Sequence, residues 1–226
     1  MKKYGVFDII GPIMIGPSSS HTAGAARIGK IAKIIAEEEL KEVKFILHGS
    51  FGKTYKGHGT DRALVAGILG MNPGDIRLRD ALIISEKVGL KVEFEEGDLG
   101  DVHPNSVKCI MRGISGLNYS IVGCSIGGGS IAIKAINDKE VDFTGNYPTL
   151  IISHKDVPGS VSKVTSLLYE DIINIAFMKV FRSEKGKEAT MIFEVDNPIS
   201  DKLLFKIKQI DYISKVIRIN PIKEGE

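Results

Sequence analysis

The chain has 226 residues, and 43% of them are hydrophobic, which is enough for one large or two small folded cores. Its 30 basic and 28 acidic residues leave a formal net charge of +2, and no stretch concentrates Lys and Arg without nearby acids, so composition gives no case for a nucleic-acid partner. No apolar run approaches the roughly 18 residues of a membrane span. The two cysteines, Cys109 and Cys124, lack a metal-ligand spacing and indicate reduced thiols in a cytoplasmic protein.

The N-terminal part of the sequence carries both helical and strand patterns. Isoleucines recur at helical spacing from residue 28 to residue 35 and predict a helix over 21–40. Ser20 or Thr22 is expected to cap this helix. The other elements predicted before residue 106 are helices over 60–69 and 79–88, strands over 43–47 and 91–95, and a loop over 98–105.

From residue 107 the pattern changes to short runs rich in Ile and Val, separated by glycines. These runs predict a strand meander over 107–112, 117–124 and 130–136. Helices in one part of the sequence and antiparallel strands in another predict an α+β fold for residues 1–145, with a mostly antiparallel sheet. Gly-Asn-Tyr-Pro at 145–148 marks the expected boundary.

Residues 149–226 restart with a pattern of their own. The predicted elements are strands over 149–153, 175–181, 190–195 and 213–219, and helices over 160–169 and 201–210. Their order is βαββαβ, which predicts a compact ferredoxin-like module.

Five consecutive polar side chains stand between an apolar stretch at 13–15 and the first predicted helix. They are Ser18, Ser19, Ser20, His21 and Thr22. Hydroxyls and an imidazole at a helix entrance suit an anion, because the first backbone N–H groups lack intrahelical partners and that end of the dipole is positive. Helix capping alone and a site for a small carboxylate both fit the segment. Capping needs only one such side chain, so five in a row favour the site.

Four segments together resemble those of one enzyme family. They are Gly-Pro-Ser-Ser-Ser-His-Thr at 16–22, Gly-His-Gly-Thr-Asp at 57–61, His-Pro-Asn at 103–105 and Ser-Ile-Gly-Gly-Gly at 125–129. Through them, residues 1–145 resemble the beta chain of the iron–sulfur-dependent L-serine dehydratase. Residues 149–226 resemble an ACT domain, a small regulatory fold that commonly binds amino acids, by their element order and the Asp-Val-Pro-Gly turn at 156–159.

The resemblance implies one subunit of an enzyme that converts L-serine to pyruvate and ammonia by α,β-elimination of water. The family holds a [4Fe–4S] cluster with cysteines of its alpha part, and this sequence lacks such a set. An alpha chain that ligates the cluster is therefore the expected partner, and no metal site is expected in this chain. A non-catalytic amino-acid-sensing protein, and a subunit that only stabilises a catalytic partner, are the alternatives.

His58 is the expected catalytic base, because histidine titrates near working pH and its neutral form accepts a proton. Gly57 and Gly59 let the backbone approach a ligand closely. The alternative is a loop imidazole with ordinary hydrogen bonds. Asp61 is expected either to orient a catalytic group or only to favour the start of the next helix, and Thr60 either to contact substrate or to cap that helix.

Further substrate contacts are implied for Asn105 and Ser125. Ser125, before three glycines, offers a hydroxyl and exposed amides, although a plain strand-to-strand turn has the same sequence. Asn105, next to Pro104, fits either a rigid active-site loop or a surface turn.

In the ACT-like module, the resemblance places an amino-acid effector near the first strand–helix loop, often between paired modules. The residues concerned are His154, Asp156 and Gly159. Self-association through this module is expected, and a module that only dimerises is the alternative to one that senses amino acids.

Overall fold

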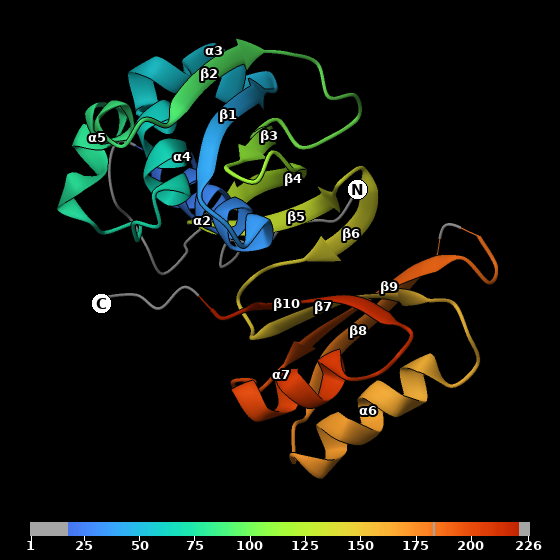
Figure 1. The fold of residues 1–226 in the computed structure, drawn as a ribbon. Helices are drawn as coiled ribbons and strands as arrows, with labels where there is room; N and C mark the ends of the chain where they lie inside the picture. Colours follow the sequence, from blue (N-terminus) through green and yellow to red (C-terminus); the bar gives the residue numbers. More distant parts are fainter. Residues whose placement is uncertain (1–17, 183, 222–226) are drawn as a thin grey trace. The chain divides into compact units, whose positions relative to one another are not determined.

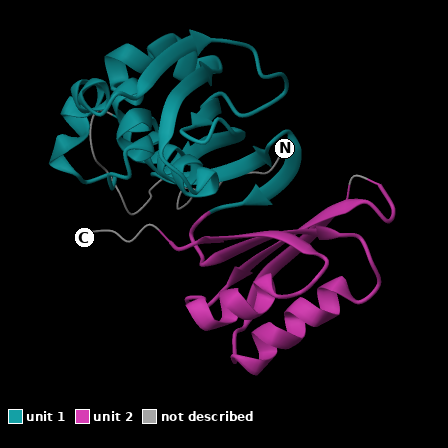
Figure 2. Ribbon diagram, in the orientation of Figure 1, with its two compact units in different colours: residues 1–144, 222–226 teal, residues 145–221 magenta. Residues whose placement is uncertain are grey.

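The computed structural model describes residues 18–182 and 184–221 (Figure 1). Gly16, Pro17 and the apolar stretch at 13–15 lie outside the described residues. The chain divides into two compact units, the first comprising the described residues up to Thr144 and the second Gly145–Pro221 (Figure 2). Both units mix helices with sheets, which confirms the predicted α+β class.

The first unit is built on a six-stranded sheet with the order β2-β1-β3-β4-β5-β6. Its strands are β1 (Leu40–Leu47), β2 (Lys91–Glu96), β3 (Ser106–Gly113), β4 (Asn118–Gly127), β5 (Ser130–Ile136) and β6 (Lys139–Phe143). Only β1 and β2 pair in parallel, so the sheet is mostly antiparallel, as predicted. Strand β6 was not predicted, because it is short and only Val141 and Phe143 of its side chains are buried.

The predicted helix over 21–40 is in fact two elements. A π-helical turn, η1 (Ser20–Gly24), leads into the α-helix α2 (Ala25–Ala36), and Glu37 ends the helix in a left-handed conformation with φ 57°. The predicted cap is wrong, since the N-cap position is Ser19 and no side chain bonds there. Instead, the amide of Gly24 donates to the carbonyl of Ser19 at 3.1 Å, the i→i−5 bond of a π turn.

Helix α3 (Gly49–His58) occupies a segment between the strand predicted over 43–47 and the helix predicted over 60–69, where no element was predicted. It begins directly after β1 and ends where Gly59 takes a φ of 71°, after which α4 (Thr60–Ile68) starts. His58 is therefore the last residue of a helix, and the alternative of a loop imidazole is wrong about its place in the fold. Two short elements follow, η2 (Ile76–Asp80) and α5 (Ala81–Lys87), where a single helix over 79–88 was predicted.

Two glycines allow α2 and α4 to cross in close contact. A Cβ atom on Gly67 would lie 2.1 Å from the carbonyl oxygen of Ala26, and one on Gly29 would lie 2.3 Å from that of Leu64. Ala26 and Leu64 are fully buried at this crossing. The helix backbones thus touch directly, and this contact holds the start of α2 in place over the sheet.

Glu38 ties the turn after α2 to the turn between β3 and β4. Its carboxylate accepts hydrogen bonds from the Tyr119 hydroxyl at 2.5 Å and from the Ser115 amide and hydroxyl at 2.9 and 2.7 Å. These hydrogen bonds, with the one from Tyr119 foremost, lower the pKa of Glu38 below its ordinary value, and they raise the pKa of Tyr119 to about 12.

The second unit has the predicted βαββαβ order. Its elements are β7 (Thr149–Lys155), α6 (Ser160–Glu170), β8 (Ile175–Arg182), β9 (Glu188–Val195), α7 (Asp201–Lys208) and β10 (Ile213–Ile219). The strands form an antiparallel sheet with the order β10-β7-β9-β8, and both helices lie on the same side of it (Figure 1). Val164 and Leu168 of α6 pack with Phe193 of β9 in the core of this unit.

Replacing Gly67 with Ala is expected to destabilise the protein, because the added methyl group collides with backbone rather than with a side chain that can rotate. Overpacking of this kind should lower the free energy of unfolding by about 2 kcal/mol. Denaturant unfolding of the full chain measures it. Gly57→Ala is the matched control, since nothing lies within 4 Å of its added methyl group and alanine is the better helix former; an equal loss in both variants would contradict the crossing.

Replacing Glu38 with Gln should destabilise the protein at neutral pH and have little effect in acid. The folded state depresses the pKa of Glu38, so its stabilisation is present above the unfolded value near 4.5 and is lost as the pH falls through the folded value. Thermal unfolding of both proteins at neutral pH and below pH 4 measures this. A difference in melting temperature that does not shrink in acid would refute the role of the carboxylate charge.

Candidate functional site

The π turn η1 is the centre of the candidate site. From His21 to Gly24 its residues are buried, and the turn contacts α3, α4, β4 and β5. These elements carry His58 and Thr60 of the segment 57–61 and Ser125 of the segment 125–129, so with the turn itself three of the segments singled out in the sequence meet here. Side chains far apart in the chain are therefore gathered around one buried turn.

His21 is held by hydroxyl groups on both sides of its ring. Its Nδ1 lies 3.0 Å from Ser18 Oγ, and its Nε2 lies 3.3 Å from Ser50 Oγ. The ring of Phe51 packs against it with centroids 5.2 Å apart. Both nitrogens of the imidazole therefore have a hydroxyl partner, and the Phe51 ring provides an apolar contact on another side of the imidazole.

His58 meets His21 ring to ring. The centroids are 4.7 Å apart and the planes are nearly perpendicular, at 83°. Burial, followed by the proximity of His58, lowers the pKa of His21 below its ordinary value. His21 is therefore neutral at neutral pH, and it does not add a positive charge beside His58.

Four polar atoms around the π turn are buried without a hydrogen-bond partner. They are Thr22 Oγ1, His58 Nδ1, Thr60 Oγ1 and Ser125 Oγ. Thr60 was expected as a possible helix cap, but the N-cap of α4 is Gly59 and no side chain bonds there. A buried polar group without a partner costs free energy, and a cluster of four indicates a place where a polar ligand binds.

Ser125 is fixed by two close contacts. A Cβ atom on Gly24 would lie 2.1 Å from Ser125 Oγ, so only glycine fits at that position of the π turn. The amide of Ser125 donates to the carbonyl of Asn105 at 3.0 Å, which joins β4 to the end of the 98–105 loop. The amide of Asn105 in turn lies 3.1 Å from His103 Nδ1. Asn105 is thus connected to the site through its backbone.

The three glycines after Ser125 form a left-handed turn that a buried cation anchors. Gly127, Gly128 and Gly129 all have positive φ, at 120°, 55° and 79°. Arg27, on α2, is 6% exposed and donates from its guanidinium to the Gly129 carbonyl at 3.0 Å. The helix that follows the π turn therefore also holds the far end of this segment.

The remaining predicted residues lie at the edge of this cluster. Ser19 and Ser20 are half-buried in the first turn, and Gly57 is exposed on α3. Asp61, in the first turn of α4, accepts a hydrogen bond from the amide of Arg62 at 2.8 Å, which is a local contact of its own helix.

Sequence reasoning gave no role to Ser50. Its hydroxyl reaches His21, and its amide donates to the Pro104 carbonyl at 2.8 Å. The sequence could have indicated a role for Ser50 only by its position, because the segment His-Gly-Ser-Phe-Gly at 48–52 directly follows a predicted strand.

No group of three or more His, Cys, Asp or Glu side chains within residues 18–182 and 184–221 is arranged to hold a metal ion. Cys109 and Cys124 are buried on β3 and β4, and burial raises the pKa of both thiols. Thiols of this kind are protonated and poor ligands. Nor is any helix in the described part of the chain long and apolar enough to cross a membrane.

In the second unit, the three predicted effector residues lie at the loop between β7 and α6. His154 is buried, its Nδ1 lies 2.8 Å from the Lys155 carbonyl, and its Nε2 has no partner. Asp156 accepts from the Gly186 amide at 3.0 Å and from Arg182 at 3.4 Å, and these contacts, the amide first, lower the pKa of its carboxyl. Gly159 begins α6 with a φ of 86°.

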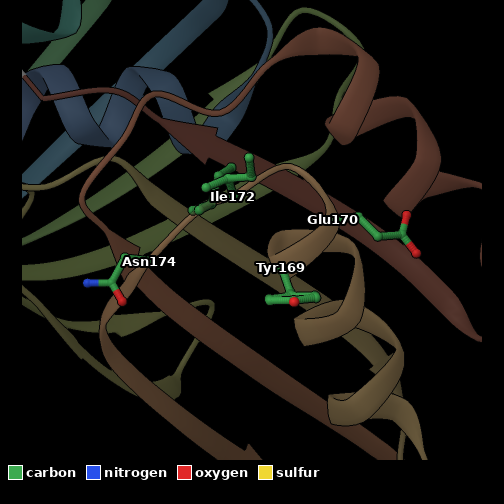
Figure 3. A pocket seen from close by; sticks show the side chains of 5 residues that line it. Tyr169, Glu170, Ile172 and Asn174 are labelled. Carbon is green, nitrogen blue, oxygen red and sulfur yellow. The ribbon is translucent and has the colours of Figure 1, made fainter.

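A surface hollow of about 540 Å³ lies at the opposite end of α6 (Figure 3). Tyr169, Glu170, Ile172, Ile173 and Asn174 line it. Helix α6 has 11 residues and spans about 16 Å, so the hollow is well separated from Gly159. The hollow and the predicted effector loop are therefore different places on this unit.

Comparison with known families identifies both parts of the chain. The family model described as serine dehydratase beta chain matches residues 5–91, and that of the ACT domain matches residues 148–211.

Similarity to known chains extends over nearly the whole sequence. The chain is 42% identical to the "Probable L-serine dehydratase, beta chain" of Bacillus subtilis (strain 168), over 97% of this chain and 99% of that one. It is 41% identical to the "L-serine dehydratase, beta chain" of Peptoniphilus asaccharolyticus, over 90% and 92%. It is also 29% identical to the D-3-phosphoglycerate dehydrogenase of Methanocaldococcus jannaschii, over 87% of this chain but only 37% of that enzyme.

Proposed function

This chain belongs to the family of L-serine dehydratase beta chains, and from that premise we propose that it is one subunit of an enzyme that converts L-serine to pyruvate and ammonia. The observation that supports the proposal most strongly is the group of buried, unpartnered polar atoms around η1, with the His58 imidazole among them. The names of its relatives, which are beta chains, support an alpha chain as the partner.

The proposal leaves the [4Fe–4S] cluster to the alpha chain. The described residues do not fit it, because both cysteines are buried as protonated thiols on separate strands and no group of three or more described His, Cys, Asp or Glu side chains is arranged to hold a metal. What this chain contributes is a proton acceptor and groups that bind and orient the substrate.

His58 is proposed to accept the Cα proton of L-serine. The electron pair of the broken C–H bond forms the Cα–Cβ double bond as the Cβ–O bond breaks. The hydroxide that departs takes up one proton to become water, which balances the proton that His58 gains. The resulting 2-aminoacrylate tautomerises to an imine, which water hydrolyses to pyruvate and ammonia. A neutral His21 beside His58 favours this role, since it adds no positive charge that would oppose protonation of the base.

The hydroxyls of Thr22, Thr60 and Ser125 are proposed to orient the substrate. All three are buried and unpartnered, so a bound carboxylate or ammonium group would supply the hydrogen bonds they lack. A site that is built to donate to a ligand discriminates strongly against molecules that leave those groups unpaired.

An amino-acid-sensing role without catalysis is the second candidate. The match to a D-3-phosphoglycerate dehydrogenase favours it, because a region similar to most of this chain occurs there as about a third of an enzyme named for other chemistry. Such a module would bind an amino acid through the same hydroxyls. A proton acceptor beside the ligand is required by the first candidate alone.

Co-expression with an alpha chain under anaerobic conditions tests the proposal. The purified complex should form pyruvate from L-serine, and this chain alone should form none. His58→Ala in the complex should lower kcat by about 100-fold or more, since general base catalysis contributes that much, while serine binding is retained. Pyruvate formation and calorimetric binding of serine measure the two effects.

Lys56→Gln is the matched control, because Lys56 is exposed on the same helix two residues before His58. It should leave kcat unchanged. Normal turnover in His58→Ala would remove the assignment of the base. Serine binding to a complex that never produces pyruvate would favour the sensing role instead.

The ACT domain is proposed to bind an amino-acid effector at the β7–α6 loop, and Asp156 is the residue that fastens this loop to the β8–β9 turn. Asp156→Asn should change the half-saturating serine concentration, or its response to added amino acids, by about fivefold, with kcat unchanged. Initial rates of the complex over a range of serine concentrations measure this.

Glu184→Gln is the control for that loop. Glu184 forms an exposed ion pair with Lys187 in the same turn, and such pairs contribute little. If Asp156→Asn and Glu184→Gln both leave the saturation curve unaltered, the module is not coupled to catalysis through this loop.

A further inference from the structure

Ser50 joins three parts of the candidate site, although none of the sequence patterns assigns it a role. Its hydroxyl lies 3.3 Å from His21 Nε2. Its amide donates to the Pro104 carbonyl at 2.8 Å, and its carbonyl accepts from the Thr54 hydroxyl at 2.7 Å. The amide of Ser50 therefore ties the start of α3 to Pro104, and its hydroxyl is directed at one atom, whereas the bond from Thr54 is an ordinary contact within the helix.

The ring of His21 depends on two serines for its orientation. Ser18 lies at Nδ1, 3.0 Å away, and Ser50 at Nε2. In a neutral imidazole one nitrogen donates and the other accepts, and a hydroxyl can do either, so both bonds form in a single tautomer. A flip of the ring about its Cβ–Cγ bond would remove both nitrogens from their partners.

The orientation of His21 affects His58, because the two rings are in contact at 4.7 Å. Among the described residues of the elements that contact η1, α3 presents the imidazole of His58 to His21. Helix α4 and strand β4 also contact the π turn, and the buried hydroxyls that they carry, those of Thr60 and Ser125, do not titrate in the physiological range. His58 is thus the side chain whose surroundings change most directly with the orientation of the His21 ring.

The geometry points to Ser50 as a positioning residue for the proton transfer: its hydroxyl holds the His21 ring in one orientation and one tautomer, so that His21 supports the His58 imidazole from a fixed position. This inference rests on the proposed function in assigning the base to His58. Ser50 itself touches neither reacting atom.

Removal of the Ser50 hydroxyl leaves His21 Nε2 buried without its partner. The His21 ring is then free to rotate, to exchange between its two tautomers, or to become protonated and bond a water molecule. Each of these outcomes changes the part of the ring that contacts His58. A misplaced catalytic group lowers turnover more than substrate affinity, because binding uses other side chains.

The first test is the state of His21 in the full-length chain, which needs neither cluster nor partner. Nitrogen NMR of histidine-labelled protein, assigned with a His21→Gln variant, reports the tautomer. Wild type should show one protonated and one unprotonated ring nitrogen for His21 at neutral pH. Ser50→Ala should bring the two signals toward an average, and Ser50→Thr, which restores a hydroxyl, should return them to the wild-type positions.

The second test is activity in the assembled complex. Ser50→Ala should lower kcat by roughly 10- to 100-fold with little change in KM, and Ser50→Thr should recover most of it. Thr54→Val is the matched control, since it removes a hydroxyl one turn further along the same helix that bonds only the Ser50 carbonyl in the described contacts. It should leave both the His21 signals and kcat unchanged.

Wild-type His21 signals in Ser50→Ala would overturn the inference, and so would an equal change in Thr54→Val. If Ser50→Ala does not fold, Ser50→Cys takes its place, since its thiol has a similar shape and is a weak hydrogen-bond donor. Altered His21 signals in a complex that never deaminates serine would refute the proposed function and leave the role of Ser50 in fixing the ring intact.

Discussion

The contact on which the site depends is the one between Gly24 and Ser125. No side chain fits between the π turn and strand β4, since a Cβ atom on Gly24 would lie 2.1 Å from Ser125 Oγ. This absence of a side chain lets η1 lie buried between strands and helices rather than on the surface. Once it is buried, each polar group that the turn carries must find a partner within the protein or on a ligand.

Some of those polar groups find partners within the chain and others do not. His21 is satisfied by Ser18 and Ser50, whereas Thr22 has no partner for its hydroxyl. Each unsatisfied group costs about 1–3 kcal/mol, which is large against the net stability of a domain. The fold bears this cost through its aliphatic core and the close crossing of α2 and α4. A cost of that size, concentrated in one place, is typical of a binding site and not of a structural turn.

Sequence patterns predicted most of the elements because periodicity is a local property. The α2 region, the strand meander and the βαββαβ module all follow from apolar spacing. Helix α3 escaped prediction because it contains glycines at 49, 52 and 57, which lower intrinsic helix propensity. Gly52 is required there by packing, since its Cβ would lie 2.8 Å from the Leu47 carbonyl. A requirement of that kind is set by tertiary structure and does not appear in the spacing of apolar residues along the sequence.

The same reasoning explains which parts of the candidate site the sequence could indicate. Concentrations of hydroxyls, glycines and histidines marked the segments 16–22, 57–61 and 125–129, and the structure brings their described residues together. The partnership between Ser50 and His21 joins residues 29 positions apart and depends on how α3 packs on η1. A single serine after a strand carries no such information by itself.

The arrangement also bears on why catalysis by this chain would need a partner. In the proposed mechanism the described residues around η1 serve one half of an elimination, with an imidazole as proton acceptor and hydroxyls for binding. The other half is the departure of hydroxide, which needs an acid or an electrophile near the β-carbon. His21 is a poor candidate for that acid, because burial and His58 both lower its pKa and keep it neutral. This asymmetry fits the proposed division of labour, in which this chain removes the proton and a group on the partner chain assists the leaving hydroxyl.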